Sequence, residues 1–379
     1  MNSSFRIATV AGIPIRVHIT FFLILLLAAY QWFVITDTLN GAVFGAALMA
    51  LLFVCVTLHE LGHSLVARVY GIPVRQIILL PLGGIAQITK NPEKPLHELL
   101  IAIAGPLVNV VIAVLLLAGL GFTVSPQLLT GHGLLPAESG QTPSLNTALF
   151  WLLAANVSLV VFNLIPAFPL DGGRALRALI AMFTGYPRAT RLASAIGQFI
   201  AVFLGLYSVL IGHFILTLVA VFIFFGAGQE TSEAEAKTVL DTLRVGDAYN
   251  KHALTLAVGD RVSRVVDYLL TSYQPDFAVL QGRNPIGIVT RNDVLAALAM
   301  HTGDTFVTEM MHREFLKVDA AQSLDEVRRT MAEQNTRIAA VYDGANYLGL
   351  VSMEDITEAF AVQTFVERQK QLLQTQANA

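Results

Sequence analysis

The chain has 379 residues, of which 55% are hydrophobic and 13% are charged, and its mean hydropathy is +0.63. Soluble domains carry roughly 25% charged residues, so this composition excludes an ordinary soluble protein and indicates a membrane protein. The net charge of −3 gives no reason to expect a nucleic-acid partner, and the single cysteine, Cys55, excludes an intramolecular disulfide and a cysteine-based zinc knuckle.

Long apolar runs fill the chain from about residue 21 to residue 228, after which the composition becomes that of a soluble protein. A membrane-spanning helix needs about 20 apolar residues. The runs cover residues 18–36, 42–66, 97–120, 147–168 and 192–228, and the last fits two short spans separated at residues 211–213. The sequence therefore predicts six spans. No small-x-small cleavage site follows the first run, so we interpret it as a span and not as a signal peptide.

Positive charge alternates along the connections between these spans. Arginine and lysine lie before the first span and after the second and the fourth, whereas the loops after the first and the third (residues 121–141) carry neither. Cytoplasmic loops carry the excess of positive charge in membrane proteins. The pattern predicts a multi-pass protein of a plasma or inner membrane, with both termini and the soluble part in the cytoplasm.

The second span contains the sequence His59-Glu60-Leu-Gly-His63. Ionisable side chains at this depth are costly unless they have partners. A helix places residues four apart on one face, so His59 and His63 can present two imidazoles to one metal ion, and Glu60 can take a proton from water beside it. A polar cluster that only holds helices together is the alternative, but it needs no second histidine at this spacing.

A catalytic zinc site needs a third protein ligand. The candidate is Asp171, at the end of a motif that reads Asn163-x-x-Pro166-x-x-Pro169-Leu-Asp171. The prolines interrupt the fourth span, and irregular backbone at membrane depth is tolerated where it is buried in protein or lines a cavity. From the residues alone two interpretations stay open, a metal ligand or the N-cap of the following helix.

These two motifs together resemble those of the site-2 protease family of intramembrane zinc metalloproteases. The resemblance covers about residues 13–177 and implies that His59, His63 and Asp171 hold one zinc ion, that Glu60 activates water, and that Asn163 and Pro166 shape the substrate site. It further implies regulated intramembrane proteolysis of a transmembrane protein substrate.

Residues 71–89 alternate between apolar and polar types, and several of the apolar residues are β-branched. This pattern predicts a short hairpin or re-entrant loop. By resemblance this hairpin would pair with an unwound substrate, although a plain structural hairpin is the alternative.

The soluble part contains an internal repeat with an offset of 62 residues, in which Thr290 and Asp293 correspond to Ser352 and Asp355. Each copy reads as helix, strand, turn, strand, helix, and the pair resembles tandem CBS domains, whose clefts often bind adenine nucleotides. The resemblance implies ATP or AMP as ligand, with these four residues at the ribose. A purely structural pair is the alternative.

The predicted fold class is a multi-span α-helical membrane protein of about six transmembrane helices, with a short membrane-associated β element and a soluble α/β tandem CBS module. We expect a protease domain over residues 1–228, a helical linker over 229–242, CBS domains over 243–301 and 302–365, and a polar tail over 366–379. Expected partners are a transmembrane substrate, membrane lipid and a second copy bound through the CBS pair.

Two other classes of function compete with a protease. A CBS-regulated transporter would be expected to show repeated halves in its spans, and none is found. A non-catalytic membrane scaffold would have no need of Glu60.

Overall fold

The computed structural model describes residues 4–81, 83–88, 92, 94–120, 142–272, 274–300 and 304–377. The chain divides into two compact units, Met1–Ser232 and Glu233–Ala379, which are taken one at a time. The predicted loop at residues 121–141 lies outside the described residues.

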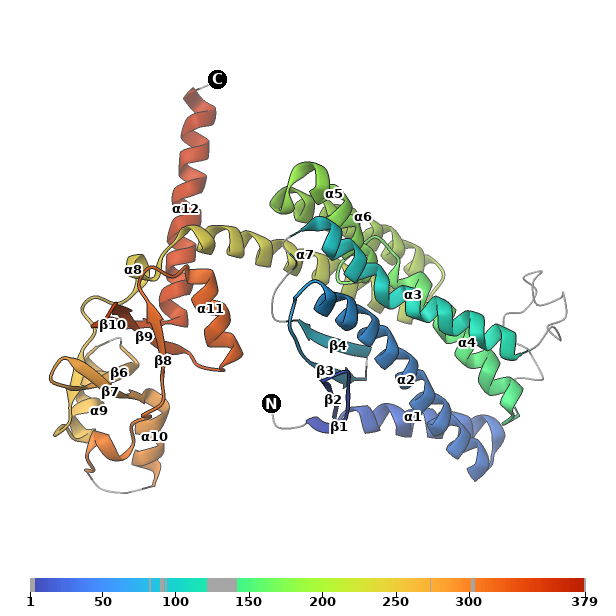
Figure 1. Cartoon of the computed structure of the whole chain (residues 1–379), viewed down its shortest axis with the longest axis horizontal. Coiled ribbons are helices and arrows are strands. Elements are labelled where there is room, and N and C mark those ends of the chain that lie inside the picture. The colour runs from blue at the N-terminus through green and yellow to red at the C-terminus, as the bar shows by residue number, and fades with distance from the viewer. Residues whose placement is uncertain are drawn as a thin grey trace. The chain divides into compact units, whose positions relative to one another are not determined.

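The first unit is built on apolar helices (Figure 1). They are α1 (Phe21–Thr36), α2 (Leu39–Val69), α3 (Pro95–Gly119), α4 (Leu145–Asn163), α6 (Tyr186–Leu210) and α7 (Phe214–Thr242), whose last residues belong to the second unit. The shorter α5 (Asp171–Thr184) lies between α4 and α6 in the chain and carries charged residues. In the described part, α2, α3, α4, α6 and α7 are long and apolar enough to cross a membrane, and α1 is apolar but has 16 residues. Five of the six predicted spans therefore correspond to helices of spanning length, whereas α1, at the place of the first predicted span, is shorter.

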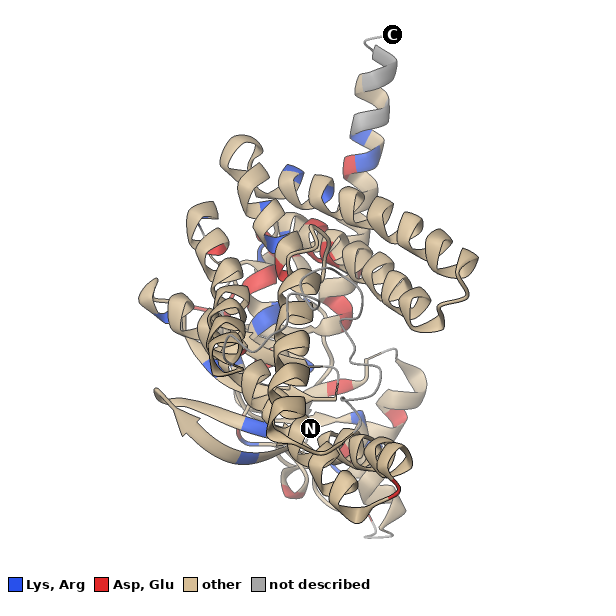
Figure 2. Ribbon diagram, turned by 90° about the vertical axis from the view of Figure 1, so that its right-hand side faces the viewer, with Lys and Arg blue, Asp and Glu red and all other residues tan. Residues whose placement is uncertain are grey.

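Charged residues are sparse along the apolar helices (Figure 2). α1 and α4 contain none. Large apolar side chains such as Leu23, Leu115 and Phe203 are more than half exposed. Such surfaces are unfavourable in water, so these faces suit lipid.

The fourth helix is shorter than the predicted span, which reaches residue 168. The helix ends at Asn163, because Pro166 and Pro169 follow.

A four-stranded sheet lies beside α2 in this unit (Figure 1). Its strands are β1 (Ser4–Val10), β2 (Ile13–His18), β3 (Val74–Leu80) and β4 (Gly83–Ile88), in the order β1-β2-β3-β4. β2 and β3 run parallel, and the other pairs are antiparallel. Alternate residues of β2 and β3, including Ile15 and Ile77, are buried against Phe53 and Leu61 of α2. The predicted hairpin at residues 71–89 is present. β1 and β2 are not among the predicted elements, although their alternating apolar residues were an available signal.

The second unit contains the two repeats. The first comprises α8 (Val245–Ala248), β5 (Thr255–Ala257), α9 (Val262–Thr271), β6 (Asp276–Gln281), β7 (Asn284–Thr290) and α10 (Arg291–Ala299). The second comprises η3 (Val307–Glu309), β8 (Leu316–Asp319), α11 (Leu324–Glu333), β9 (Ile338–Asp343), β10 (Asn346–Ser352) and α12 (Met353–Ala377). Each repeat forms a three-stranded sheet with one parallel and one antiparallel pair, and a shared apolar core contains residues of both sheets, such as Ile288 and Leu350.

The opening segments of the two repeats are exchanged. Val245 is buried in the core of the second repeat, with Val318 and Val351, and Val307 is buried in the core of the first. The predicted domains are consecutive stretches of the chain, whereas each packed domain contains the opening segment of the other repeat. The predicted linker is helical, because α7 runs to Thr242, and α12 continues through most of the predicted tail to Ala377.

Candidate metal centre

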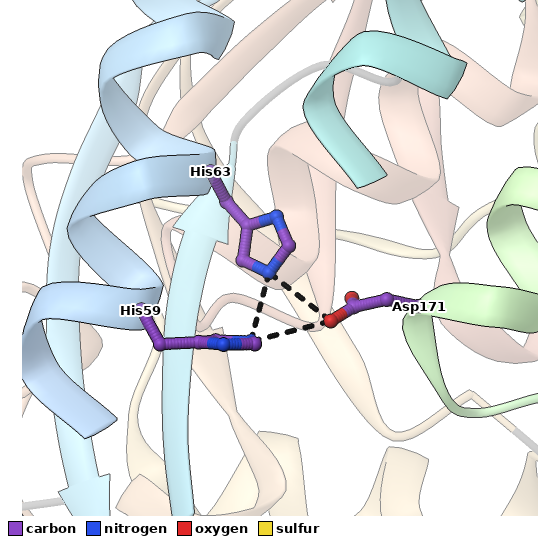
Figure 3. A group of neighbouring side chains, drawn as sticks. All are labelled: His59, His63 and Asp171. Atoms are coloured by element: carbon purple, nitrogen blue, oxygen red, sulfur yellow. Dashed lines mark hydrogen bonds and ion pairs between the residues drawn. The ribbon is translucent and has the colours of Figure 1, made fainter. Parts of the chain in front are cut away.

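The two histidines of α2 face an aspartate from the start of α5 (Figure 3). His59 Nε2 and His63 Nε2 each lie 3.2 Å from Asp171 Oδ2, and they lie 3.1 Å from one another. Both histidines are 6% exposed. Among the described residues, these three form a group of donor atoms that could hold a metal ion.

The spacing of these atoms suits zinc. Zinc bonds to imidazole nitrogen and carboxylate oxygen are about 2.0 Å long, so two ligands of a tetrahedral ion lie about 3.3 Å apart. The three separations, of 3.1 and 3.2 Å, are close to this value. Two imidazoles and one carboxylate are also a donor set of catalytic zinc sites, which leave the fourth position open. Cys55 is buried and lies outside the group.

Hydrogen bonds on the far side of each imidazole set its orientation. His59 Nδ1 lies 2.9 Å from Asn109 Oδ1, and Asn109 Nδ2 donates to Asn156 Oδ1 at 3.1 Å. His63 Nδ1 donates to the carbonyl oxygen of Ile101 at 2.7 Å. With a proton on Nδ1, each ring keeps the lone pair of Nε2 for a metal, as partners of zinc-bound histidines commonly arrange. Neither asparagine is among the predicted site residues, although an amide inside an apolar run was an available signal.

A glycine lets α3 approach the histidines. A Cβ atom at Gly105 would lie 2.1 Å from His63 Nε2 and 2.7 Å from His59 Nε2. No real contact is this short, so a side chain at this position would displace at least one imidazole.

The backbone before Asp171 is irregular and closely packed. A cis peptide bond joins Phe168 and Pro169, and a Cβ atom at Gly172 would lie 2.3 Å from the carbonyl oxygen of Ile165. The N-cap of α5 is Leu170, so the N-cap interpretation of Asp171 is wrong. As the first residue of α5, the carboxylate lies at the positive end of the helix dipole, where a negative charge is stabilised.

An ion pair with the buried Glu98 connects α5 to neighbouring helices. Arg177 Nε donates to Glu98 Oε1 of α3 at 2.8 Å, and its Nη1 donates to Glu230 Oε2 of α7 at 3.1 Å. Its guanidinium carbon also lies 5.0 Å from the centre of the Phe168 ring. These contacts connect the helix that carries Asp171 to two apolar helices, a role that its charge alone did not indicate.

Glu60 and the two predicted substrate residues lie in different surroundings. Glu60 is half-buried, and its Oε2 accepts a hydrogen bond of 3.1 Å from the backbone N–H of Ala86 in β4. Asn163 is the half-buried last residue of α4, and Pro166 is exposed in the segment that follows. The role of Asn163 and Pro166 at a substrate stays a prediction.

The predicted nucleotide residues start helices in the two repeats. Thr290 and Asp293 form a capping box at α10, and Asp293 Oδ1 also lies 2.9 Å from His312 Nε2. Ser352 and Asp355 exchange equivalent bonds at α12, of 2.8 and 3.0 Å. A pocket of about 320 Å³ lies beside Asp293. Burial raises the pKa of Asp293, but the hydrogen bonds from Thr290 and His312 outweigh it and hold this pKa below its usual value.

Two family profiles and several known proteins are similar to this chain. The sequence profile of peptidase family M50 matches residues 47–207, and that of the CBS domain matches residues 307–362. A zinc metalloprotease of Methanocaldococcus jannaschii is 33% identical over 371 residues, which are 98% of this chain and 100% of that protein. Stage IV sporulation protein FB of Bacillus subtilis is 30% identical over 38% of this chain and 44% of its own. The solved structure of a site-2 protease from M. jannaschii, 40% identical, covers 60% of this chain and 95% of its own, with a TM-score of 0.43.

Proposed function

This chain belongs to peptidase family M50 as a zinc metalloprotease of the site-2 type, and we propose that it hydrolyses peptide bonds in or near the transmembrane segments of other membrane proteins. One observation carries the proposal. The donor atoms of His59, His63 and Asp171 lie within 3.2 Å of one another in a unit of apolar helices, with Glu60 next to the first histidine. A protease centre placed there suits substrates that are themselves within the membrane.

The residues divide the chemistry between them. Zinc, when bound, supplies a Lewis acid that polarises the scissile carbonyl. His59, His63 and Asp171 would hold it, while Asn109 and the Ile101 carbonyl keep both imidazoles in the metal-binding tautomer. Glu60 accepts a proton from the attacking water and returns it to the leaving amine nitrogen.

Substituting Glu60 tests this assignment. The Glu60→Gln variant in liposomes should keep its zinc, because the three ligands are intact, and should lose cleavage of a co-reconstituted transmembrane substrate. Glu314→Gln, at an exposed position of the second unit, is the matched control and should cleave normally. Cleavage by Glu60→Gln at the wild-type rate would refute the mechanism.

The substrate and the orientation of the enzyme are part of the proposal. A transmembrane helix hides its peptide bonds, so it must unwind before hydrolysis. We propose that the unwound segment pairs with the edge of the sheet at β4, that Asn163 and Pro166 also contact the substrate, and that both termini face the cytoplasm. Trapping with Glu60→Gln, followed by mass spectrometry, would identify the substrate.

For the second unit we propose that AMP or ATP binds and regulates cleavage. The capping boxes of Thr290–Asp293 and Ser352–Asp355 support this proposal, because each carboxylate retains acceptor capacity that a ribose hydroxyl can use. Calorimetric titration of the full-length protein with AMP and with ATP should give saturable heat. An absence of heat with both would contradict nucleotide binding but not the protease. A homodimer through this unit stays a prediction.

A further inference from the structure

The catalytic base is held by the sheet edge that a substrate would use. Glu60 Oε2 accepts the N–H of Ala86, and a Cβ atom at Gly84 would lie 2.5 Å from Glu60 Cγ. β4 therefore covers the Glu60 side chain closely, and Gly84 provides the space for it.

In the described part of the chain, β4 pairs with β3 alone and forms one edge of the sheet. Ala86 is in register with Ile77 of β3, but its N–H donates to Glu60 and so points away from β3. Backbone groups of a strand alternate in direction, so the N–H of Gly84 shares this outward side. These outward groups are the ones that an added strand would pair with.

We propose that the backbone amide of Ala86 is exchanged between Glu60 and the substrate. Before a substrate binds, the amide holds the Glu60 carboxylate at the sheet edge. An unwound substrate segment that adds to β4 offers a carbonyl oxygen to the same N–H, and Glu60, having lost this partner, becomes free to take the proton of water. Ala86 thus acts as a positioning residue, and strand docking releases the base only when a peptide is in place. This inference rests on the proposed strand addition to the sheet.

Binding measurements on inactive variants test the exchange. Glu60→Gln keeps an oxygen that can accept the Ala86 N–H, whereas Glu60→Ala keeps none, and both remove the catalytic carboxylate. The probe is a fluorescent transmembrane peptide that the wild-type enzyme cleaves. Glu60→Ala should bind it about fivefold more tightly, because the peptide then has no competitor for one hydrogen bond.

Adding Ala86→Pro to each variant should abolish the difference, since proline has no N–H and is tolerated on an edge strand where that group faces outward. Ala86→Val keeps the N–H and should preserve the fivefold ratio. Equal Kd values for Glu60→Ala and Glu60→Gln, or a ratio that persists with Ala86→Pro, would overturn the exchange. A wild-type enzyme that cleaves no transmembrane peptide would instead overturn the proposed function.

Hydrogen exchange provides a second measurement that does not need the proline variant to fold. The Ala86 amide should exchange slowly in Glu60→Gln and faster in Glu60→Ala, and the peptide should restore slow exchange in Glu60→Ala. Equal exchange in the two variants without peptide would also overturn the inference.

Discussion

Replacing Gly105 by alanine should empty the metal centre without removing any ligand. The new Cβ atom would lie 2.1 Å from His63 Nε2, and ordinary contact begins near 3.4 Å, so the imidazole must retreat by about 1.3 Å or α3 must move away. Zinc–nitrogen bonds are about 2.0 Å long, and a ligand displaced so far no longer coordinates. Since loss of an outer partner already weakens metal binding about 10- to 100-fold, we expect a decrease of more than about 100-fold here.

The assay is the zinc content of the purified protein at a series of buffered free-zinc concentrations, together with cleavage of a transmembrane peptide. Gly119→Ala is the matched control, because it lies on the same helix and a Cβ atom there has no neighbour within 4 Å. That variant should bind zinc and cleave as the wild type does. Gly105→Ala with a wild-type zinc affinity would refute the argument that α3 packs directly on the histidines.

Three further predictions concern the supports of the site and the second unit. Asn109→Leu removes the partner of His59 Nδ1 and should weaken zinc binding about 10- to 100-fold, measured by competition with a chelator. Arg177→Met leaves the buried Glu98 carboxylate without its cation and should lower the free energy of unfolding by about 3–5 kcal/mol, seen as a lower unfolding temperature in detergent. Burial raises the pKa of Asp325, but hydrogen bonds from two arginines of α11 outweigh burial and hold this pKa below its ordinary value of 3.8. The ionised carboxylate therefore stabilises the fold above pH 3.8, and this stabilisation is lost as the pH falls through the lowered pKa. Asp325→Asn should therefore unfold at a lower temperature than the wild type at pH 7, with a difference that shrinks below about pH 4.

Each of these predictions would be contradicted by a specific result. Asn109→Leu with unchanged zinc affinity would mean that another group orients His59. For the ion pair, the double variant Arg177→Met/Glu98→Leu should recover part of the lost stability, and a further loss would contradict the buried-charge argument. A difference between Asp325→Asn and the wild type that is constant from pH 7 to pH 3 would show that packing, and not charge, makes Asp325 stabilising.

Much of the fold could be predicted because it follows from local properties of the chain. Uninterrupted apolar length marks a membrane helix, so the positions of the apolar helices could be predicted, although the predicted fourth span ran five residues past the end of α4 at Asn163. The spacing of His59 and His63 needs only a helix to bring the imidazoles together. The repeat of Thr290 and Asp293 at Ser352 and Asp355 is likewise visible without a structure.

Other features arise from contacts between residues far apart in the chain, and only the tertiary structure decided them. No local pattern shows that Asn109 orients His59, that Arg177 is held by Glu98, or that the opening segments of the two repeats exchange places.

The same holds at the metal centre. The sequence alone determined two histidines and a neighbouring base within an apolar span, because helical spacing is a local property. Asp171 could have been an N-cap or a ligand, and its place opposite the histidines depends on how α5 packs against α2 and α3. The hydrogen bond from the Ala86 amide to Glu60 also depends on tertiary packing. The two residues are far apart in the chain, and they meet only because β4 packs against α2.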